Sequence, residues 1–80
     1  MSDESEVMST DIMSTGDRLI YMANQIARNL AAQRDADVQT AEHIRKYWTG
    51  AMRARLQELA AERPDALSPI AAQALRRIAV

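Results

Sequence analysis

Apolar residues recur at every third or fourth position in four separate segments of the chain, and this spacing restricts the fold more than any other feature. Such spacing places apolar side chains on one face of an α-helix, whereas a half-buried strand requires strict alternation. Asp, Gly and Pro residues separate the segments, at positions where helices commonly end or restart. The sequence therefore predicts an all-α protein, a compact bundle of four short helices.

The four predicted helices span about residues 16–33, 37–48, 51–62 and 69–79. Ser14 and Thr15 are both suited to cap the first helix, and Ser14 precedes Asp17 by three residues, which is the spacing of a capping box. Thr49 and Ser68 are also suited to cap the helices that follow them. Pro69 occupies the first helical position, which proline favours. Either Asp35 or Asp37 can cap helix 37–48, so local sequence signals predict where all four helices begin.

Acidic side chains are concentrated at the start of the chain. Residues 1–17 carry five acidic and no basic side chains, whereas residues 18–80 carry ten basic and six acidic ones, a local charge of +4. A segment this polar buries too little apolar surface to fold. Residues 1–14 are therefore predicted to be a disordered acidic tail that keeps the chain soluble, and residues 15–80 to be the helical domain.

The chain is short and lacks the usual devices that stabilise small proteins. It has 80 residues, no Cys, and His43 as its single His. A core of this size contributes only about 3–5 kcal/mol, and a lone His without a thiolate does not suit a zinc site. A partner subunit, or self-association into a homo-oligomer, is therefore the expected source of further stability.

The expected location is the cytoplasm. The absence of Cys is compatible with a reducing compartment. No apolar run reaches the length of a membrane span, and the N-terminus lacks the basic and then apolar order of a signal peptide. We therefore expect no membrane association.

The sequence contains no recognisable catalytic motif. The two Gly residues are far apart and form no phosphate-binding loop, and without Cys there is no thiol nucleophile or iron–sulfur ligand. His43 lies in mid-helix beside Glu42, where a surface or packed His is commoner than a catalytic base. We predict no catalytic, cofactor-binding or metal-ligating residues, and no enzymatic activity for the isolated chain.

Five residues are better suited to protein contacts. Asn24 and Gln25 lie in mid-helix, where their amides can bond to a partner's backbone or face solvent. Trp48 can be an interface hot spot, or the core anchor of a chain that has no Phe. Arg45 and Arg53 flank Trp48, and can pair with carboxylates of a partner or remain solvated. We predict these five as interface residues, with the solvated or buried alternative open for each.

Two other classes of protein fit parts of the pattern. Helices 37–48 and 51–62 are short, joined by a Gly-containing turn and basic, as in a helix-turn-helix DNA-binding protein. A net charge of −1, a pI of about 5.7 and few base-reading side chains on helix 51–62 disfavour this alternative, so we expect no nucleic-acid partner. A homodimeric helical interaction module is the other alternative.

Four stretches of the sequence form a set of motifs. They read RLIYMANQIA over residues 18–27, AEHIRKYW over 41–48, MRARL over 52–56 and LSPI over 67–70. In order and spacing they resemble the delta subunits of NAD-dependent formate dehydrogenases of the molybdenum or tungsten type. Where that family commonly has Asp-Pro after the Trp, this chain has Thr49-Gly50.

The resemblance implies a function. Such delta subunits are accessory parts of a cytosolic complex, whose large catalytic subunit holds a bis-pterin molybdenum or tungsten centre and iron–sulfur clusters. Other subunits carry FMN and pass electrons to NAD. The delta subunit itself holds no cofactor. The resemblance therefore implies a non-catalytic accessory subunit that docks on the large catalytic subunit and supports its assembly or stability.

Overall fold

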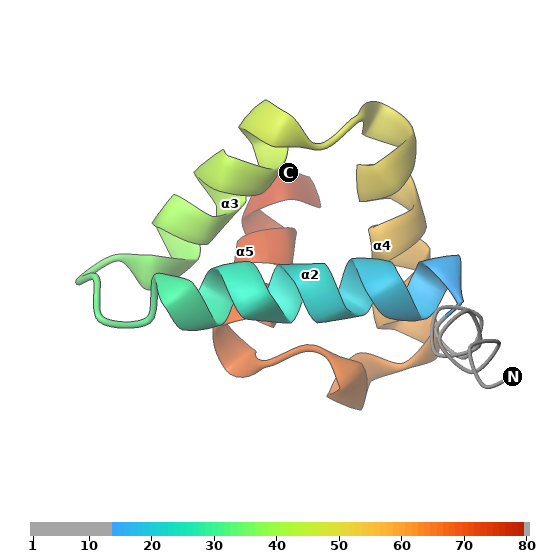
Figure 1. Ribbon diagram of the computed structural model, residues 1–80, viewed down its shortest axis with the longest axis horizontal. Helices are drawn as coiled ribbons and strands as arrows, with labels where there is room; N and C mark the ends of the chain where they lie inside the picture. The colour runs from blue at the N-terminus through green and yellow to red at the C-terminus, as the bar shows by residue number, and fades with distance from the viewer. Residues whose placement is uncertain (1–13, 80) are drawn as a thin grey trace, which may run out of the picture.

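The computed structural model describes residues 14–79, and each regular element in this range is helical. The elements, in order, are α2 (Thr15–Asn29), α3 (Ala36–Tyr47), α4 (Gly50–Glu62), the 3₁₀ turn η1 (Pro64–Ala66) and α5 (Pro69–Ala79) (Figure 1). The predicted all-α class with four helices is confirmed. The predicted tail of residues 1–14 lies outside the described residues, apart from Ser14.

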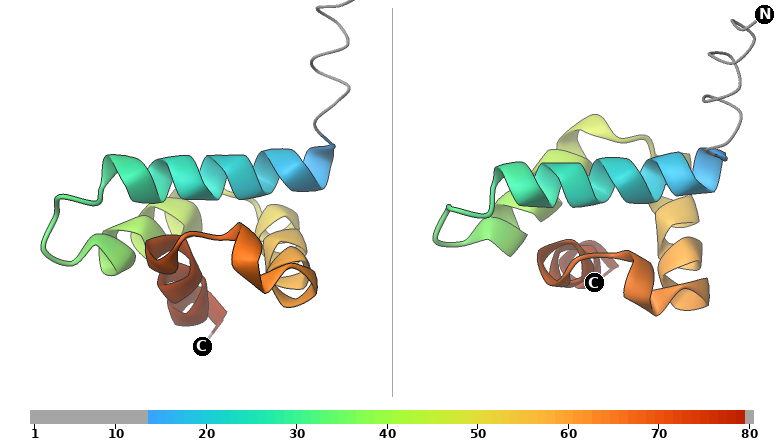
Figure 2. Two further views of the ribbon diagram at one scale, coloured as in Figure 1. Left: turned by 90° about the horizontal axis from the view of Figure 1, so that it is seen from below. Right: turned by 60° about the horizontal axis from the view of Figure 1, so that its bottom comes forward.

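The helix α2 lies across the other three helices. It packs against α3, α4 and α5, while α3 and α5 form the most extensive helix pair of the domain. Figure 2 shows α2 as one layer and the remaining helices as a second layer beneath it. In this arrangement α3 and α4 diverge from their short connection, and α5 packs beside α3 (Figure 1).

Short polar side chains begin three of the helices, as the sequence predicts. Ser14, Thr49 and Ser68 each accept a hydrogen bond from the backbone N–H three residues on, at 3.0, 3.1 and 3.2 Å. Each such N-cap is worth about 1 kcal/mol, because it satisfies an amide that has no partner within its helix. Asp35 occupies the same position before α3, but its side chain makes no capping bond.

The C-terminus of α2 differs from its prediction. The helix ends at Asn29, whereas the sequence pattern continues it to residue 33. The amide of Gln33 bonds to the carbonyl of Leu30 at 2.9 Å in a turn, and residues 31–35 are exposed. Helical propensity alone sustains few turns of helix in water, so α2 ends where burial stops. The starts of α3 and α4 each lie one residue earlier than predicted, and η1 was not predicted.

Every α-helix contributes to one apolar core. The buried cluster consists of Leu19, Ile20, Ala23, Ala27, Ile44, Trp48, Leu56, Leu59, Leu67, Ala71 and Leu75. Gly16 allows the first turn of α2 to approach α4, because a Cβ at this position would lie 3.1 Å from a methyl group of Leu59. The core is therefore assembled around α2.

Two ion pairs join helices that are distant in sequence. Asp17 of α2 pairs with Arg63 at 2.9 Å, and Asp37 of α3 pairs with Arg77 of α5 at 2.8 Å. The hydrogen bond from Arg63 is the main reason that the pKa of Asp17 lies below its usual value of 3.8. The hydrogen bond from Arg77 lowers the pKa of Asp37 in the same way. Both carboxylates therefore stabilise the fold in their charged form.

Thr40 is a polar residue within the apolar interior. It is 0% exposed, and its Oγ1 has no hydrogen-bond partner among the described residues. A buried hydroxyl without a partner loses its bonds to water and gains none in return. The domain is therefore less stable with Thr40 than it would be with an apolar side chain of the same shape.

Replacing Thr40 by Val exchanges the hydroxyl for a methyl group of similar shape. We expect the free energy of unfolding to rise by about 1 kcal/mol or more, which raises the Tm by roughly 4–8 °C per kcal/mol. Thermal unfolding followed by circular dichroism measures this. The matched control is Thr49→Val, which removes an N-cap and should cost about 1 kcal/mol. A lower Tm for Thr40→Val would contradict the prediction.

The two tertiary ion pairs predict acid sensitivity. Because the pKa values of Asp17 and Asp37 are lowered in the folded chain, their contribution is present above the unfolded pKa and is lost as pH falls through the folded pKa. We expect the free energy of unfolding at low ionic strength to decrease as pH falls below about 5. In Asp37→Asn this decrease should be smaller, whereas Asp35→Asn should retain it. Equal pH dependence in wild type and Asp37→Asn would refute the assignment.

Candidate interaction site

The structure divides the five predicted interface residues into two groups. Arg45, Trp48 and Arg53 lie around the connection between α3 and α4. Asn24 and Gln25 lie on α2, beside the segment that leads into α5. The two groups have different surroundings.

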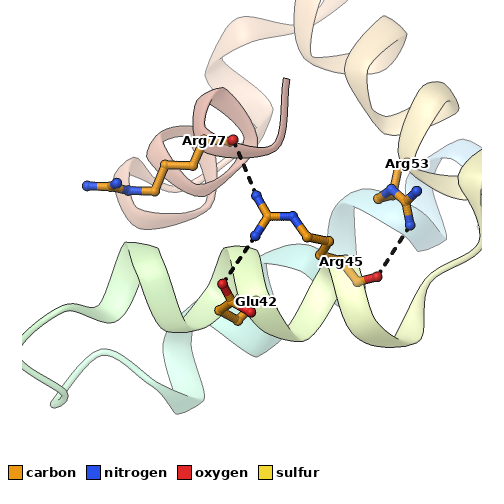
Figure 3. A network of polar contacts seen from close by, with 4 residues as sticks. All are labelled: Glu42, Arg45, Arg53 and Arg77. Atoms are coloured by element: carbon orange, nitrogen blue, oxygen red, sulfur yellow. Dashed lines mark hydrogen bonds and ion pairs between the residues drawn. The ribbon is translucent and has the colours of Figure 1, made fainter. Parts of the chain in front are cut away.

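The two arginines bond to the chain's own helix ends (Figure 3). Arg45 donates to the carboxylate of Glu42 at 3.2 Å and to the carbonyl of Arg77 in α5 at 3.4 Å. Arg53 donates to the carbonyl of Trp48 at 2.9 Å. It also donates to the carbonyl of Arg45 at 3.4 Å, the bond drawn in Figure 3. Carbonyls in the last turn of a helix lack intrahelical partners, and cations are favourable at this end of the helix dipole. Both arginines therefore stabilise helix C-termini.

Trp48 belongs to the core. It is 8% exposed and packs in the buried cluster that includes Ile44 and Leu56. Its backbone is extended and follows the last residue of α3. In the isolated chain, Trp48 therefore lies in the core, and little of its ring is accessible. This is the buried alternative that the sequence left open.

Asn24 bonds to backbone atoms, as an amide in this position can. These atoms belong to the same chain and not to a partner. Its Nδ2 donates to the carbonyl of Ala66 at 2.9 Å, and its Oδ1 accepts from the N–H of Ser68 at 2.8 Å. The two bonds use both kinds of group that the amide offers. Asn24 therefore fixes the turn between η1 and α5 against α2.

Gln25 is half-buried and borders a surface hollow next to this turn. The hollow has a volume of about 630 Å³ and lies between α2 and the segment from Asp65 to Pro69. Tyr21 and Arg28 also line it, and both are exposed. Tyr21 is 54% exposed, a large fraction for an aromatic side chain.

Tyr21 and Arg28 were not among the predicted interface residues. The sequence did contain a signal for this surface, because residues at positions 21, 25 and 28 recur at helical spacing and share one face of α2. The opposite wall of the hollow comes from a segment some forty residues later in the chain. Helical spacing on α2 alone does not reveal that wall.

Residues 14–79 offer neither a metal-binding cluster nor a membrane-spanning helix. Among residues 14–79, no group of three or more His, Cys, Asp or Glu side chains is arranged to hold a metal ion. No helix in the same range is long and apolar enough to cross a membrane. The hollow beside Asn24 and Gln25, at about 630 Å³, is larger than the one that Arg45 borders, at about 330 Å³.

Fold and surface together define a small all-α domain whose amides and arginines secure its own turns. The chain belongs to the NADH-dependent formate dehydrogenase delta subunit family, FdsD, whose family model matches residues 18–75. The match begins within the first turn of α2 and ends within α5, so it confirms the resemblance found in the motifs. Searches of curated proteins and of solved structures found no match.

The variant Asn24→Ala tests whether the two bonds of Asn24, which bridge α2 and the turn before α5, hold that turn in place. The variant leaves the Ala66 carbonyl and the Ser68 N–H without their partner, so we expect a loss of about 1–3 kcal/mol in the free energy of unfolding. Hydrogen exchange of the Ser68 amide should accelerate. In the control Gln25→Ala, stability should stay within about 0.5 kcal/mol. Unchanged exchange at Ser68 in Asn24→Ala would show that the bridge does not hold the turn.

Proposed function

We propose that this chain is a non-catalytic accessory subunit of a cytosolic NAD-dependent formate dehydrogenase complex. In this proposal it docks on the molybdenum or tungsten catalytic subunit and supports the assembly or stability of the enzyme. Family membership over residues 18–75 is the observation that carries the proposal, because the family is that of the delta subunit of this enzyme.

The composition of the core supports a role in a complex. Of the fourteen buried hydrophobic residues, six are alanines. Alanine removes little apolar area from water, so such a core contributes less to stability than one of the same size built from Leu and Ile. A partner that binds only the folded chain adds stability by mass action. Docking would therefore add the stability that the small core lacks.

The redox chemistry of the complex belongs to the other subunits in this proposal. The bis-pterin molybdenum or tungsten centre, the iron–sulfur clusters, FMN and the NAD site would all be carried by partners. This chain would bind none of them. Its contribution would be a folded surface that contacts the large catalytic subunit.

Purification of the complex with and without this chain tests the proposal. A tagged full-length chain should recover a large molybdenum- or tungsten-containing oxidoreductase together with its FMN and iron–sulfur subunits, identified by mass spectrometry. Cells that lack the chain should yield less assembled complex, because the catalytic subunit is then unsupported. The activity per bound metal atom of the complex that does assemble should be unchanged.

Other outcomes of this experiment point to different functions. An intact complex whose activity per metal atom collapses without the chain would contradict a non-catalytic role. Recovery of the chain alone would favour the homodimeric module, and recovery of nucleic acid would favour the DNA-binding alternative.

A further inference from the structure

Three adjoining hollows form one groove along α2. The hollow at Tyr21 shares Arg28 and Pro69 with a second hollow, which is lined almost entirely by carbon atoms. The second hollow shares Pro69 and Ile70 with a third, which extends to Arg34. We call these three hollows together, from Tyr21 to Arg34, the α2 groove. One of its walls is α2 together with the connection from α2 into α3, and the other is the segment from η1 into α5.

The walls of the α2 groove are held in place by the chain itself. Asn24 bonds to the backbone of Ala66 and of Ser68, and the Ser68 hydroxyl caps α5. Figure 2 shows the segment that follows α4 running alongside α2, as these bonds require. A binding surface that is already ordered loses little conformational entropy when a partner binds. The groove is therefore suited to hold a peptide segment without first rearranging.

The charges on the groove favour an acidic partner. Arg28 and Arg34 line its second and third hollows, and neither forms an ion pair with any residue in the range 14–79. Asp65 lies at the far end, near Tyr21. Asp37 lines the third hollow, and its carboxylate already pairs with Arg77. The start of α5 also opens on the groove, and the N-terminal end of a helix dipole adds positive potential.

Four other basic side chains of the domain are already neutralised. Arg45, Arg55, Arg63 and Arg77 each pair with a carboxylate of the chain. The two groove arginines differ from these four, because their guanidinium groups are available for a carboxylate from outside the domain. Arg18, Lys46, Arg53 and Arg76 form no ion pair within residues 14–79 either, but they do not line the groove. Charge complementarity therefore selects a partner segment that carries Asp or Glu.

We propose that the α2 groove binds an acidic segment of the catalytic subunit. This segment places an apolar side chain in the carbon-lined hollow between Ala27 and Ile70, and a carboxylate beside Arg28. Tyr21 forms the aromatic contact at the other end of the groove, as exposed aromatic residues often do in interfaces. The inference rests on the proposed function, and names the surface and the partner chemistry through which docking occurs.

Two exposed tyrosines provide a matched pair for the test. Tyr21 lies on the groove, whereas Tyr47 is 66% exposed on α3 and packs at a tilt against His43 of the same helix. A photo-crosslinking phenylalanine analogue replaces each tyrosine in turn, in full-length chains co-expressed with the other subunits. We expect the analogue at Tyr21 to crosslink to a peptide of the catalytic subunit that contains Asp or Glu. The analogue at Tyr47 should give at least several-fold less of this product.

Charge reversal tests the role of Arg28 in the same complex. Arg28→Glu should reduce recovery of the chain on a tagged catalytic subunit by about tenfold, whereas Lys46→Glu on the outer face of α3 should leave recovery unchanged. Both side chains are exposed, so circular dichroism should show an unaltered fold for each variant. Once the crosslink identifies the partner carboxylate, replacing it with Arg should restore binding of Arg28→Glu.

The outcomes separate the groove from the proposed function. If the wild-type chain is not recovered with the catalytic subunit, the proposed function fails and the groove assignment fails with it. If the wild-type chain is recovered and Arg28→Glu is recovered equally well, or Lys46→Glu is lost to the same extent, the groove assignment alone is overturned. Crosslinks from Tyr21 to residues 1–13 of this chain, or to a second copy of it, would also overturn the assignment.

Discussion

Burial of one face of α2 against the other three helices is the interaction on which the rest of the structure depends. Leu19, Ile20, Ala23 and Ala27 form this face, and α3, α4 and α5 all pack on this helix. Without α2, the pair of α3 and α5 would have only limited contact with α4. The ends of α2 are set by the same interaction, because the helix begins at a capped turn near Leu59 and ends where its neighbours no longer cover it.

The polar residues of the domain largely serve its own backbone. Asn24 secures the turn before α5, Arg53 bonds to carbonyls at the end of α3, and Arg45 reaches a carbonyl near the end of α5. Short helices have a high proportion of terminal amides and carbonyls without intrahelical partners, so a domain built from them needs many such bonds. This need explains why residues that stand out in the sequence as contact residues make contacts within the chain.

Local signals in the sequence predicted much of the fold. The helical spacing of apolar residues identified all four helices, and Ser14, Thr49 and Ser68 act as the caps that their positions indicated. These features depend on residues within three or four positions of one another. The end of α2 was predicted too late, because it depends on which neighbours cover the helix and not on its own propensity.

The candidate site was harder to predict from the sequence than the fold was. Asn24 and Gln25 were identified as unusual, but the backbone that Asn24 contacts lies more than forty positions away. The α2 groove has the same origin, because its two walls meet only after the chain has folded. Arg28 and Tyr21 look like ordinary surface residues until the opposite wall is known.

The alanine-rich core has a consequence for the lifetime of the chain in a cell. A domain with a small free energy of unfolding opens more often, and opened chains are the form that proteases degrade. Copies that occupy a place in a complex open less often than copies that do not, since binding favours the folded state. If the chain docks as proposed, modest core packing would allow surplus copies to be removed selectively, so that the amount of this chain would follow the amount of its partner without a separate regulator.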